Sequence, residues 1–297
     1  MRRGALFALA ALCLVATPAL ADPFDDMVAA RRDFSGAVLV VKDGAIVFDK
    51  AYGLADVARG TPNRTSTRFH IGSASMPFTD LAILRLANIG KLSLDNTAGQ
   101  FLPDLAAPDH DRPIRNLVGS GNPADHILLA RIAAAATGKP FAEDGGAGAA
   151  IFASVLETGS GWDDGSLSGD SHYAVGYDAA GHPAKLDWAA ILGADGVYST
   201  TRDMLRLVDW KALEAIPVPH SDQESVILNA SRTPSLGRWR IGTAYEIDGR
   251  DDGFTMAVLA QLDSPVAVTV VVLSNHDRAP ASDLAWNLAT VARKPAR

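Results

Sequence analysis

Ser73 carries a hydroxyl group that could act as a nucleophile. It lies in the segment Ser73-Ala74-Ser75-Met76, directly before a helix that the apolar spacing predicts over Pro77 to Asn88. A serine hydroxyl is a poor nucleophile at neutral pH, so acyl transfer through Ser73 requires a neighbouring base. The chain contains no Ser-x-x-Lys sequence and no Gly-x-Ser-x-Gly elbow to supply that setting. An equally good interpretation makes Ser73 the N-cap of the helix.

Other polar residues could in principle supply a base or bind a metal ion. His70, in the strand before Ser73, and His126, on a helix face, are candidate replacement bases, although a structural role is favoured for both. Asp109-His110-Asp111 has the composition of a metal site, but a solvated loop is favoured. The run from Asp163 to Asp170 lacks the calcium-loop pattern, so we expect a surface loop. We therefore expect neither a metal nor a cofactor.

The first 21 residues have the pattern of a secretory signal peptide. Two arginines, an apolar run too short to span a bilayer and the small-x-small sequence Ala19-Leu20-Ala21 follow one another. We expect cleavage after Ala21 and a periplasmic or secreted protein. Cys13 is the only cysteine and lies in this segment, so the remaining chain has no thiol for a disulfide or a zinc site. The formal charge of −7 disfavours a nucleic-acid partner.

The rest of the chain predicts a sheet made from both chain ends around a helical middle. Helices are expected over Phe24 to Arg32, Asp125 to Ala136, Asp203 to Leu213 and Ala281 to Ala292, with Thr200 or Thr201 as an N-cap. A Lys-Asp-Gly turn joins the runs Ser35 to Val41 and Ala45 to Phe48 into a hairpin. Three further strands are expected over Trp239 to Ile247, Phe254 to Leu262 and Val266 to Leu273. Pattern alone supports α+β and α/β equally.

Several collinear segments together resemble the serine β-lactamase-like superfamily of class C β-lactamases, DD-carboxypeptidases and family VIII esterases. They include FSGAVLVVKDGAIVFDKAYGLAD, FHIGSASMPFTDLAILRLANIG, HILLARIAAAATGKPFAE, GADGVYSTTRDMLRL and VTVVVLSNHD. The resemblance implies one domain over residues 22–297, with a sheet lobe over about 22–70 and 190–297 and a shortened helical lobe over about 71–189. The sheet is expected to be antiparallel with flanking helices, and Val266 to Leu273 should join the hairpin of Gly36 to Val41.

The resemblance also indicates what this chain lacks. Ser73 matches the family's nucleophile, but Met76 stands where the family has the lysine of Ser-x-x-Lys, and a thioether cannot accept a proton. Gly121, Asn122 and Pro123 occupy the Tyr-x-Asn position, with Asn122 one residue out of step. The turn from Gly249 to Phe254 has no lysine, histidine or threonine in register with the third motif, although Arg250 offers a positive charge.

Three hypotheses for function follow from this balance. The first is a non-catalytic periplasmic protein that binds a peptide, a glycan or a protein in the old cleft, where a small-molecule or cell-wall-type ligand is also expected to fit. The second is a weak esterase or amidase that is acylated at Ser73. The third is a structural relic without a specific ligand. The expected partners include no nucleic acid, and no membrane-spanning segment is expected after Ala21. The sequence leaves the oligomeric state open.

Overall fold

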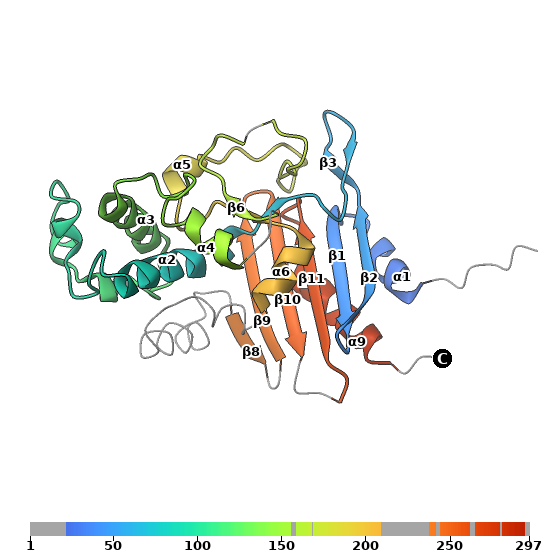
Figure 1. Ribbon diagram of the computed structural model, residues 1–297. Helices are drawn as coiled ribbons and strands as arrows, with labels where there is room; N and C mark the ends of the chain where they lie inside the picture. Colours follow the sequence, from blue (N-terminus) through green and yellow to red (C-terminus); the bar gives the residue numbers. More distant parts are fainter. Residues whose placement is uncertain are drawn as a thin grey trace, which may run out of the picture.

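Six antiparallel strands form one sheet to which both ends of the chain contribute (Figure 1). The computed structural model describes residues 22–155, 159–167, 169–208, 238–241, 244–261, 265–279 and 281–294. The strand order is β2-β1-β11-β10-β9-β8. Their bounds are β1 Gly36–Lys42, β2 Ala45–Tyr52, β8 Arg238–Ile241, β9 Ala244–Asp251, β10 Phe254–Gln261 and β11 Val268–Ser274.

The pairing of β1 with β11 confirms the predicted joining of the chain ends. The two strands are antiparallel over their whole length, from Gly36 opposite Ser274 to Lys42 opposite Val268. Both are rich in β-branched residues and buried on both faces, as expected of central strands. The predicted hairpin of β1 and β2 is also confirmed, with Asp43 and Gly44 at positive φ in its turn.

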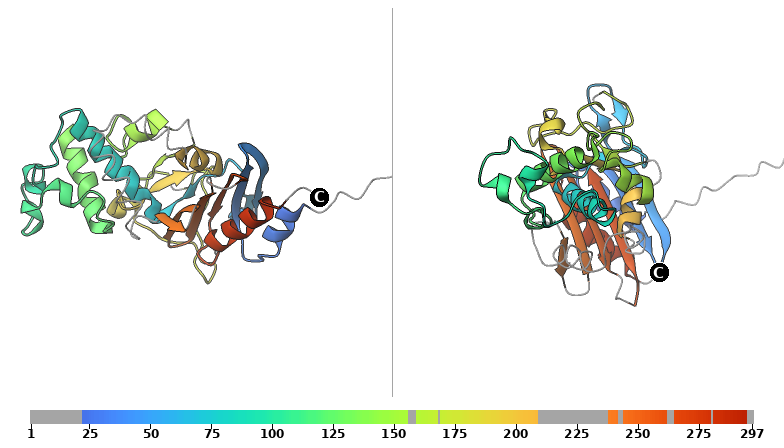
Figure 2. Two further views of the ribbon diagram at one scale, coloured as in Figure 1. Left: turned by 90° about the horizontal axis from the view of Figure 1, so that it is seen from below. Right: turned by 60° about the vertical axis from the view of Figure 1, so that its left-hand side comes forward.

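Alternate residues of the central strands enter two separate hydrophobic clusters. On one face, Val38, Val40 and Leu259 pack with apolar residues of the helix α9, Ala281–Ala292. The short helix α1, Pro23–Ala29, lies against the same face beside α9 (Figure 2). On the other face, Leu39 and Val258 belong to the cluster that continues into the helical lobe.

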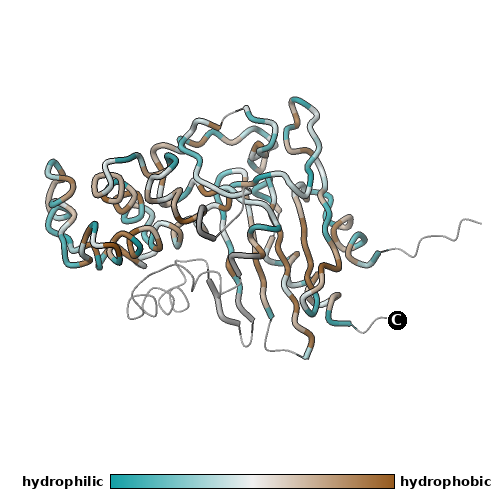
Figure 3. The backbone as a smooth tube through the Cα atoms, viewed as in Figure 1, coloured by the Kyte–Doolittle hydropathy of each residue, from teal (hydrophilic) through white to brown (hydrophobic). Residues whose placement is uncertain are grey.

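The helix α6, Thr201–Val208, lies over the opposite face, and the helical lobe extends away from the sheet (Figure 1). Its two longest helices, α2 Met76–Asn88 and α3 Pro123–Thr137, pack against each other. Brown, apolar stretches run through the central strands and through these two helices, where the core lies (Figure 3). The remaining helical segments are η1 Gly72–Ser75, η2 Ala98–Gln100, η3 Asp109–Asp111, η4 Ile114–Asn116, α4 Ala149–Val155, α5 Trp188–Ile191 and α6 Thr201–Val208.

Short strands connect the main sheet to the segment from Ser73 to Met76, called the nucleophile segment below. A three-stranded sheet of β5 Phe69–His70, β7 Val197–Ser199 and β6 Gly161–Trp162 carries the chain into η1, and β3 Leu54–Asp56 pairs with β4 Thr61–Pro62. The strand β6 ends directly before the run from Asp163 to Asp170, for which a surface loop was expected. Within the described residues, no helix is long and apolar enough to cross a membrane.

Two element predictions need correction or completion. The single strand expected over Trp239 to Ile247 is two strands, because the chain reverses between Ile241 and Ala244, which pair with each other. The helix expected from Asp203 begins at Thr201, and the part of the prediction beyond Val208 lies outside the described residues. Thr200 accepts a hydrogen bond from the Asp203 backbone N–H at 3.2 Å, so the N-cap prediction for Thr200 is confirmed.

Candidate active site

Ser73 lies in η1, the 3₁₀ turn between β5 and α2, rather than in the first turn of an α-helix. Two glycines allow η1 to approach the backbone of β9. A Cβ at Gly72, where φ is +63°, would lie 2.6 Å from the carbonyl carbon of Arg250, and a Cβ at Gly249 would lie 2.0 Å from the Ile71 carbonyl oxygen. The half-buried Ser73 therefore stands directly beside the strand that carries the family's third motif.

The N-cap interpretation of Ser73 is wrong. The residue before α2 is Ser75, and neither helical segment begins with a side-chain cap. The Ser75 hydroxyl is fully buried and accepts a hydrogen bond from the Val197 backbone N–H at 3.1 Å, which ties η1 to β7. In the described part of the chain, no hydrogen bond or ion pair engages the Ser73 hydroxyl, so this group has neither a capping partner nor a base there.

Met76 occupies the first position of α2, and its side chain is buried. Only 2% of the residue is exposed, so the thioether is withdrawn from solvent where the family's lysine would reach the serine. A buried methionine fills space and cannot carry a proton at any pH. At this position a buried apolar side chain therefore stands in place of the family's general base.

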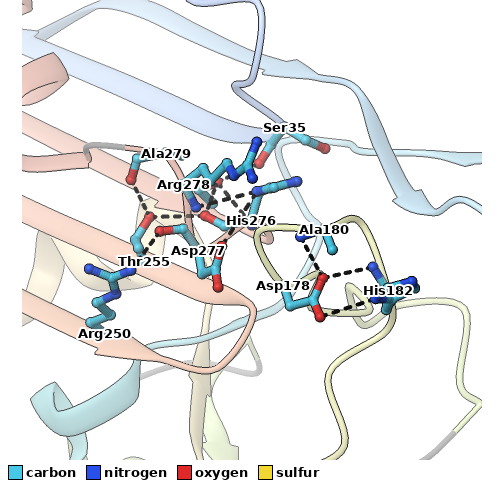
Figure 4. Close-up of polar contacts among 11 residues, drawn as sticks. Ser35, Asp178, Ala180, His182, Arg250, Thr255, His276, Asp277, Arg278 and Ala279 are labelled. Atoms are coloured by element: carbon cyan, nitrogen blue, oxygen red, sulfur yellow. Dashed lines mark hydrogen bonds and ion pairs between the residues drawn. The ribbon is translucent and has the colours of Figure 1, made fainter.

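The other two motif positions have structural roles in this chain. The Asn122 side chain accepts a hydrogen bond from the Ala124 backbone N–H at 3.0 Å, so Asn122 is the N-cap of α3 and does not substitute for the missing tyrosine. Arg250 donates from its guanidinium to the Asp277 carbonyl oxygen at 3.1 Å, on the side of the sheet where the chain leaves β11 (Figure 4). Its charge is thus engaged away from Ser73.

Two carboxyl groups lie next to each other near the turn from Gly249 to Phe254. Asp195 precedes β7 and Asp251 ends β9, and one carboxylate oxygen of Asp251 is buried without a hydrogen-bond partner of standard geometry. Burial raises the pKa of Asp195 well above its ordinary value, and the neighbouring Asp251 carboxylate raises it further. Both effects favour the protonated form of the Asp195 carboxyl group. No pattern in the sequence signals this pair.

His126 does not face Ser73 but forms a sealed pair with Asp80. Its Nε2 lies 3.2 Å from Asp80 Oδ1, without the geometry of a good hydrogen bond, and both side chains are fully buried. The other ring nitrogen, Nδ1, donates to the Asn122 carbonyl oxygen at 2.9 Å. Burial, the largest single influence, lowers the pKa of His126, but the Asp80 carboxylate outweighs it and the net pKa is raised. The pair fastens α3 to α2.

His70 also forms a buried pair, with Asp163. Nε2 of His70 lies 3.1 Å from Asp163 Oδ2, and the two side chains are 7% and 4% exposed. The expected surface loop over Asp163 to Asp170 is therefore wrong at its first residue. Burial raises the pKa of Asp163, but the hydrogen bonds from His70 and from the Gly165 backbone N–H outweigh it and lower the pKa.

A cavity of about 580 Å³ opens beside this second pair. The His70 ring stacks on Trp188 with centroids 3.7 Å apart and meets the edge of Phe254, and all three line the cavity. Arg59, Lys185 and several carboxylates surround them, while Ser73 and Met76 are not part of the lining. The volume is that of a small-molecule site, with an aromatic wall and a few polar groups.

Among the residues that the structure describes, no three histidine, cysteine or acidic side chains converge. Asp109-His110-Asp111 forms η3, not an open loop, and His110 Nδ1 lies 2.8 Å from Asp111 Oδ1.

Known proteins are similar to this chain in its N-terminal third and in its fold. The Beta-lactamase family model matches residues 24–119. Esterase EstB of Burkholderia gladioli is 37% identical over 81 residues, which are 27% of this chain and 21% of the esterase. The chain thus matches about a fifth of the length of this relative. Residues 24–119 contain the first two of the five segments that carry the resemblance, and these include Ser73 and Met76.

Solved structures extend the similarity to the whole fold. A penicillin-binding protein from Bacillus halodurans superposes with a TM-score of 0.71 at 21% identity, covering 92% of this chain and all of that one. A class C β-lactamase from Rhodobacter sphaeroides gives a TM-score of 0.63 at 18% identity, covering 90% of this chain and 97% of that one. The resemblance to the serine β-lactamase-like superfamily is confirmed, and the chain has the β-lactamase/transpeptidase-like fold with an antiparallel sheet.

Proposed function

We propose that this protein is an exported, β-lactamase-related binding protein that no longer turns over acyl substrates through Ser73. The observation that carries the proposal is Met76, which is buried at the position of the family's lysine. General-base catalysis contributes roughly 10²–10⁴-fold, and loss of one member of a serine catalytic set costs up to about 10⁶-fold. The Tyr-x-Asn and third-motif positions offer no replacement, because Asn122 caps a helix and Arg250 binds a backbone carbonyl.

The ligand proposed for the retained fold is a small molecule or a peptide of the cell-wall type. The cavity beside His70 and Trp188 supports this proposal, since its volume and mixed lining suit a compact polar ligand with a ring or apolar group. Export remains part of the proposal and rests on the N-terminal sequence. Intact-mass measurement of the periplasmic protein tests it: a mature N-terminus at Asp22 is expected, and a membrane-bound species that retains Met1 would refute cleavage.

A weak serine esterase is the second candidate. It is favoured by the match to Esterase EstB over 81 residues and by the position of Ser73, which is half-buried at the edge of β9 and not engaged by any described base. In this alternative, Ser73 is acylated slowly by an activated ester.

Covalent labelling distinguishes the two candidates. The protein is incubated with a fluorophosphonate or a penicillin-type probe, and the adduct is measured by intact mass. We expect no stoichiometric adduct. Acylation of Ser73 within minutes, abolished in Ser73→Ala, would establish the esterase and overturn the main proposal.

A second experiment tests whether the missing lysine alone accounts for the expected lack of activity. Met76→Lys is expected to restore little activity, because the tyrosine position and the third-motif turn stay without their functional groups. Robust turnover in Met76→Lys would show that the rest of the site is intact. Far-UV circular dichroism confirms that the variant is folded, since a lysine here is placed at a buried position.

A further inference from the structure

Three arginines converge on a second cavity, on the α9 side of the sheet and away from Ser73. Arg31 and Arg32 follow α1, and Arg278 follows β11 almost 250 residues later in the chain. The cavity has a volume of about 390 Å³ and is also lined by Ala30, Asp33, Phe34 and Leu284. Phe34 and Leu284 belong to the hydrophobic cluster under α9, whereas the residues around Ser73 belong to the cluster on the opposite face. This cavity is therefore independent of the candidate active site.

The fold brings the two basic segments together through backbone contacts. The Asn275 backbone N–H donates to the Ser35 carbonyl oxygen at 3.1 Å, and the Ser274 hydroxyl donates to the same oxygen at 2.8 Å. Arg278 follows these residues in the chain (Figure 4), and it lines the same cavity as Phe34, which precedes Ser35. The positions of these arginines are thus set by the paired ends of the central strands β1 and β11.

The guanidinium groups have no counter-ion among the residues that the structure describes. No ion pair there involves Arg31, Arg32 or Arg278, and Asp33 is the single carboxylate in the cavity lining. The end of α1 does not use their charges either, because the backbone N–H groups of Ala30 and Arg31 already donate to its last carbonyls. Three unpaired cations facing one carboxylate leave a local excess of positive charge in a chain whose net charge is −7.

We propose that Arg31, Arg32 and Arg278 form a binding site for a phosphate-class anion. A guanidinium presents a planar fork of donors that matches the oxygens of a phosphate, and charge-assisted bonds of this kind are about twice as strong as neutral ones. The apolar floor of Phe34 and Leu284 accommodates a short organic group attached to the anion. Free phosphate compounds and lipid headgroups share this chemistry.

Titration with inorganic phosphate tests the site directly. Binding is measured by calorimetry and by thermal shift at constant pH, with sodium chloride at the same ionic strength as the reference. The wild type is expected to bind phosphate and to gain stability beyond the chloride reference. Arg278→Gln should weaken phosphate binding about tenfold or more, since one charge-assisted hydrogen bond is lost, and the triple glutamine variant should abolish it. Arg64→Gln is the matched control, because Arg64 is exposed, has no ion pair in the described structure and lies outside the cavity.

Vesicle sedimentation separates the two sources of the anion. If phosphatidylglycerol vesicles, but not phosphatidylcholine vesicles, retain the wild type and release the triple variant, the site binds a lipid headgroup. Phosphate binding without vesicle binding identifies a soluble phosphate compound. The proposal is overturned if neither probe binds, or if the triple variant and the wild type respond equally to both. Circular dichroism verifies folding, and Arg278→Gln alone carries the test if the triple variant does not fold.

Discussion

Two buried histidine–aspartate pairs flank the nucleophile segment, and they differ in what surrounds them. His70–Asp163 borders a cavity of about 580 Å³ and stacks on Trp188, whereas His126–Asp80 is fully enclosed between α2 and α3. Either pair could have been a replacement base for Ser73. Neither engages its hydroxyl in the described structure. Because His70–Asp163 borders the cavity, a ligand can reach this pair. The enclosed pair His126–Asp80 instead holds α2 and α3 together.

The enclosed pair should give the largest loss of stability when it is broken. Asp80→Ala leaves the His126 ring buried without its carboxylate and removes the acceptor of the Gly119 backbone N–H. We expect a loss of about 3–5 kcal/mol in the free energy of unfolding, measured by urea denaturation. Asp109→Ala is the control, because its ion pair with Arg112 is partly exposed and should contribute less than about 1 kcal/mol. Equal losses in the two variants would contradict the distinction.

The pair beside the cavity should be less costly to break. Asp163→Ala removes the acceptor of His70 and of the Gly165 backbone N–H, but water in the cavity can reach the groups left behind. We expect a loss of about 1.5–3 kcal/mol in the same assay. Asp164→Ala, at the exposed neighbouring position, should change stability by less than about 0.5 kcal/mol. A loss for Asp163→Ala as large as that for Asp80→Ala would show that the cavity does not relieve the first pair.

Opposite responses to pH should separate the two pairs further. The pKa of His126 is raised above 6.5, so the stability it contributes is fully present below pH 6.5 and is lost as pH rises through the raised value. The pKa of Asp163 is lowered below 3.8, so its contribution is present above pH 3.8 and is lost as pH falls through the lowered value. The stability difference between wild type and His126→Gln should narrow on the alkaline side, and that between wild type and Asp163→Asn on the acid side. Differences that change in the same direction would refute this assignment.

The sequence predicted elements better than it predicted pairings between distant side chains. The periodic patterns located α2, α3, α9 and the joined strands β1 and β11, because burial on one or both faces leaves a local signature. Met76 was identified from its place at the lysine position of the Ser-x-x-Lys motif, and the structure shows that its side chain is buried. Asp163 was assigned to a surface loop because its partner, His70, lies 93 residues away, and the Asp195–Asp251 pair was missed for the same reason. Composition cannot show which acidic residue of a polar segment turns inward.

Two serines of the nucleophile segment provide the smallest predicted effects. Ser75→Ala removes the acceptor of the Val197 backbone N–H inside the protein, which leaves a buried donor unsatisfied and should cost about 1–3 kcal/mol. Ser73→Ala should change stability by less than about 0.5 kcal/mol, because the hydroxyl is half-buried and engages no described partner.

The comparison of the two alanine variants tests whether Ser73 has a structural role at all. Ser73 is kept at the family's nucleophile position, two residues from a serine that ties η1 to β7, so a structural reason for its presence would be the simplest one. If denaturation shows that only Ser75→Ala is destabilising, stability does not explain Ser73, and a role toward a ligand or a residual acyl group becomes the better account. If Ser73→Ala is as destabilising as Ser75→Ala, the hydroxyl supports η1 and the segment is a structural remnant. That outcome would also remove the main structural argument for a weak esterase, because a hydroxyl held by the fold is not free to attack a carbonyl carbon.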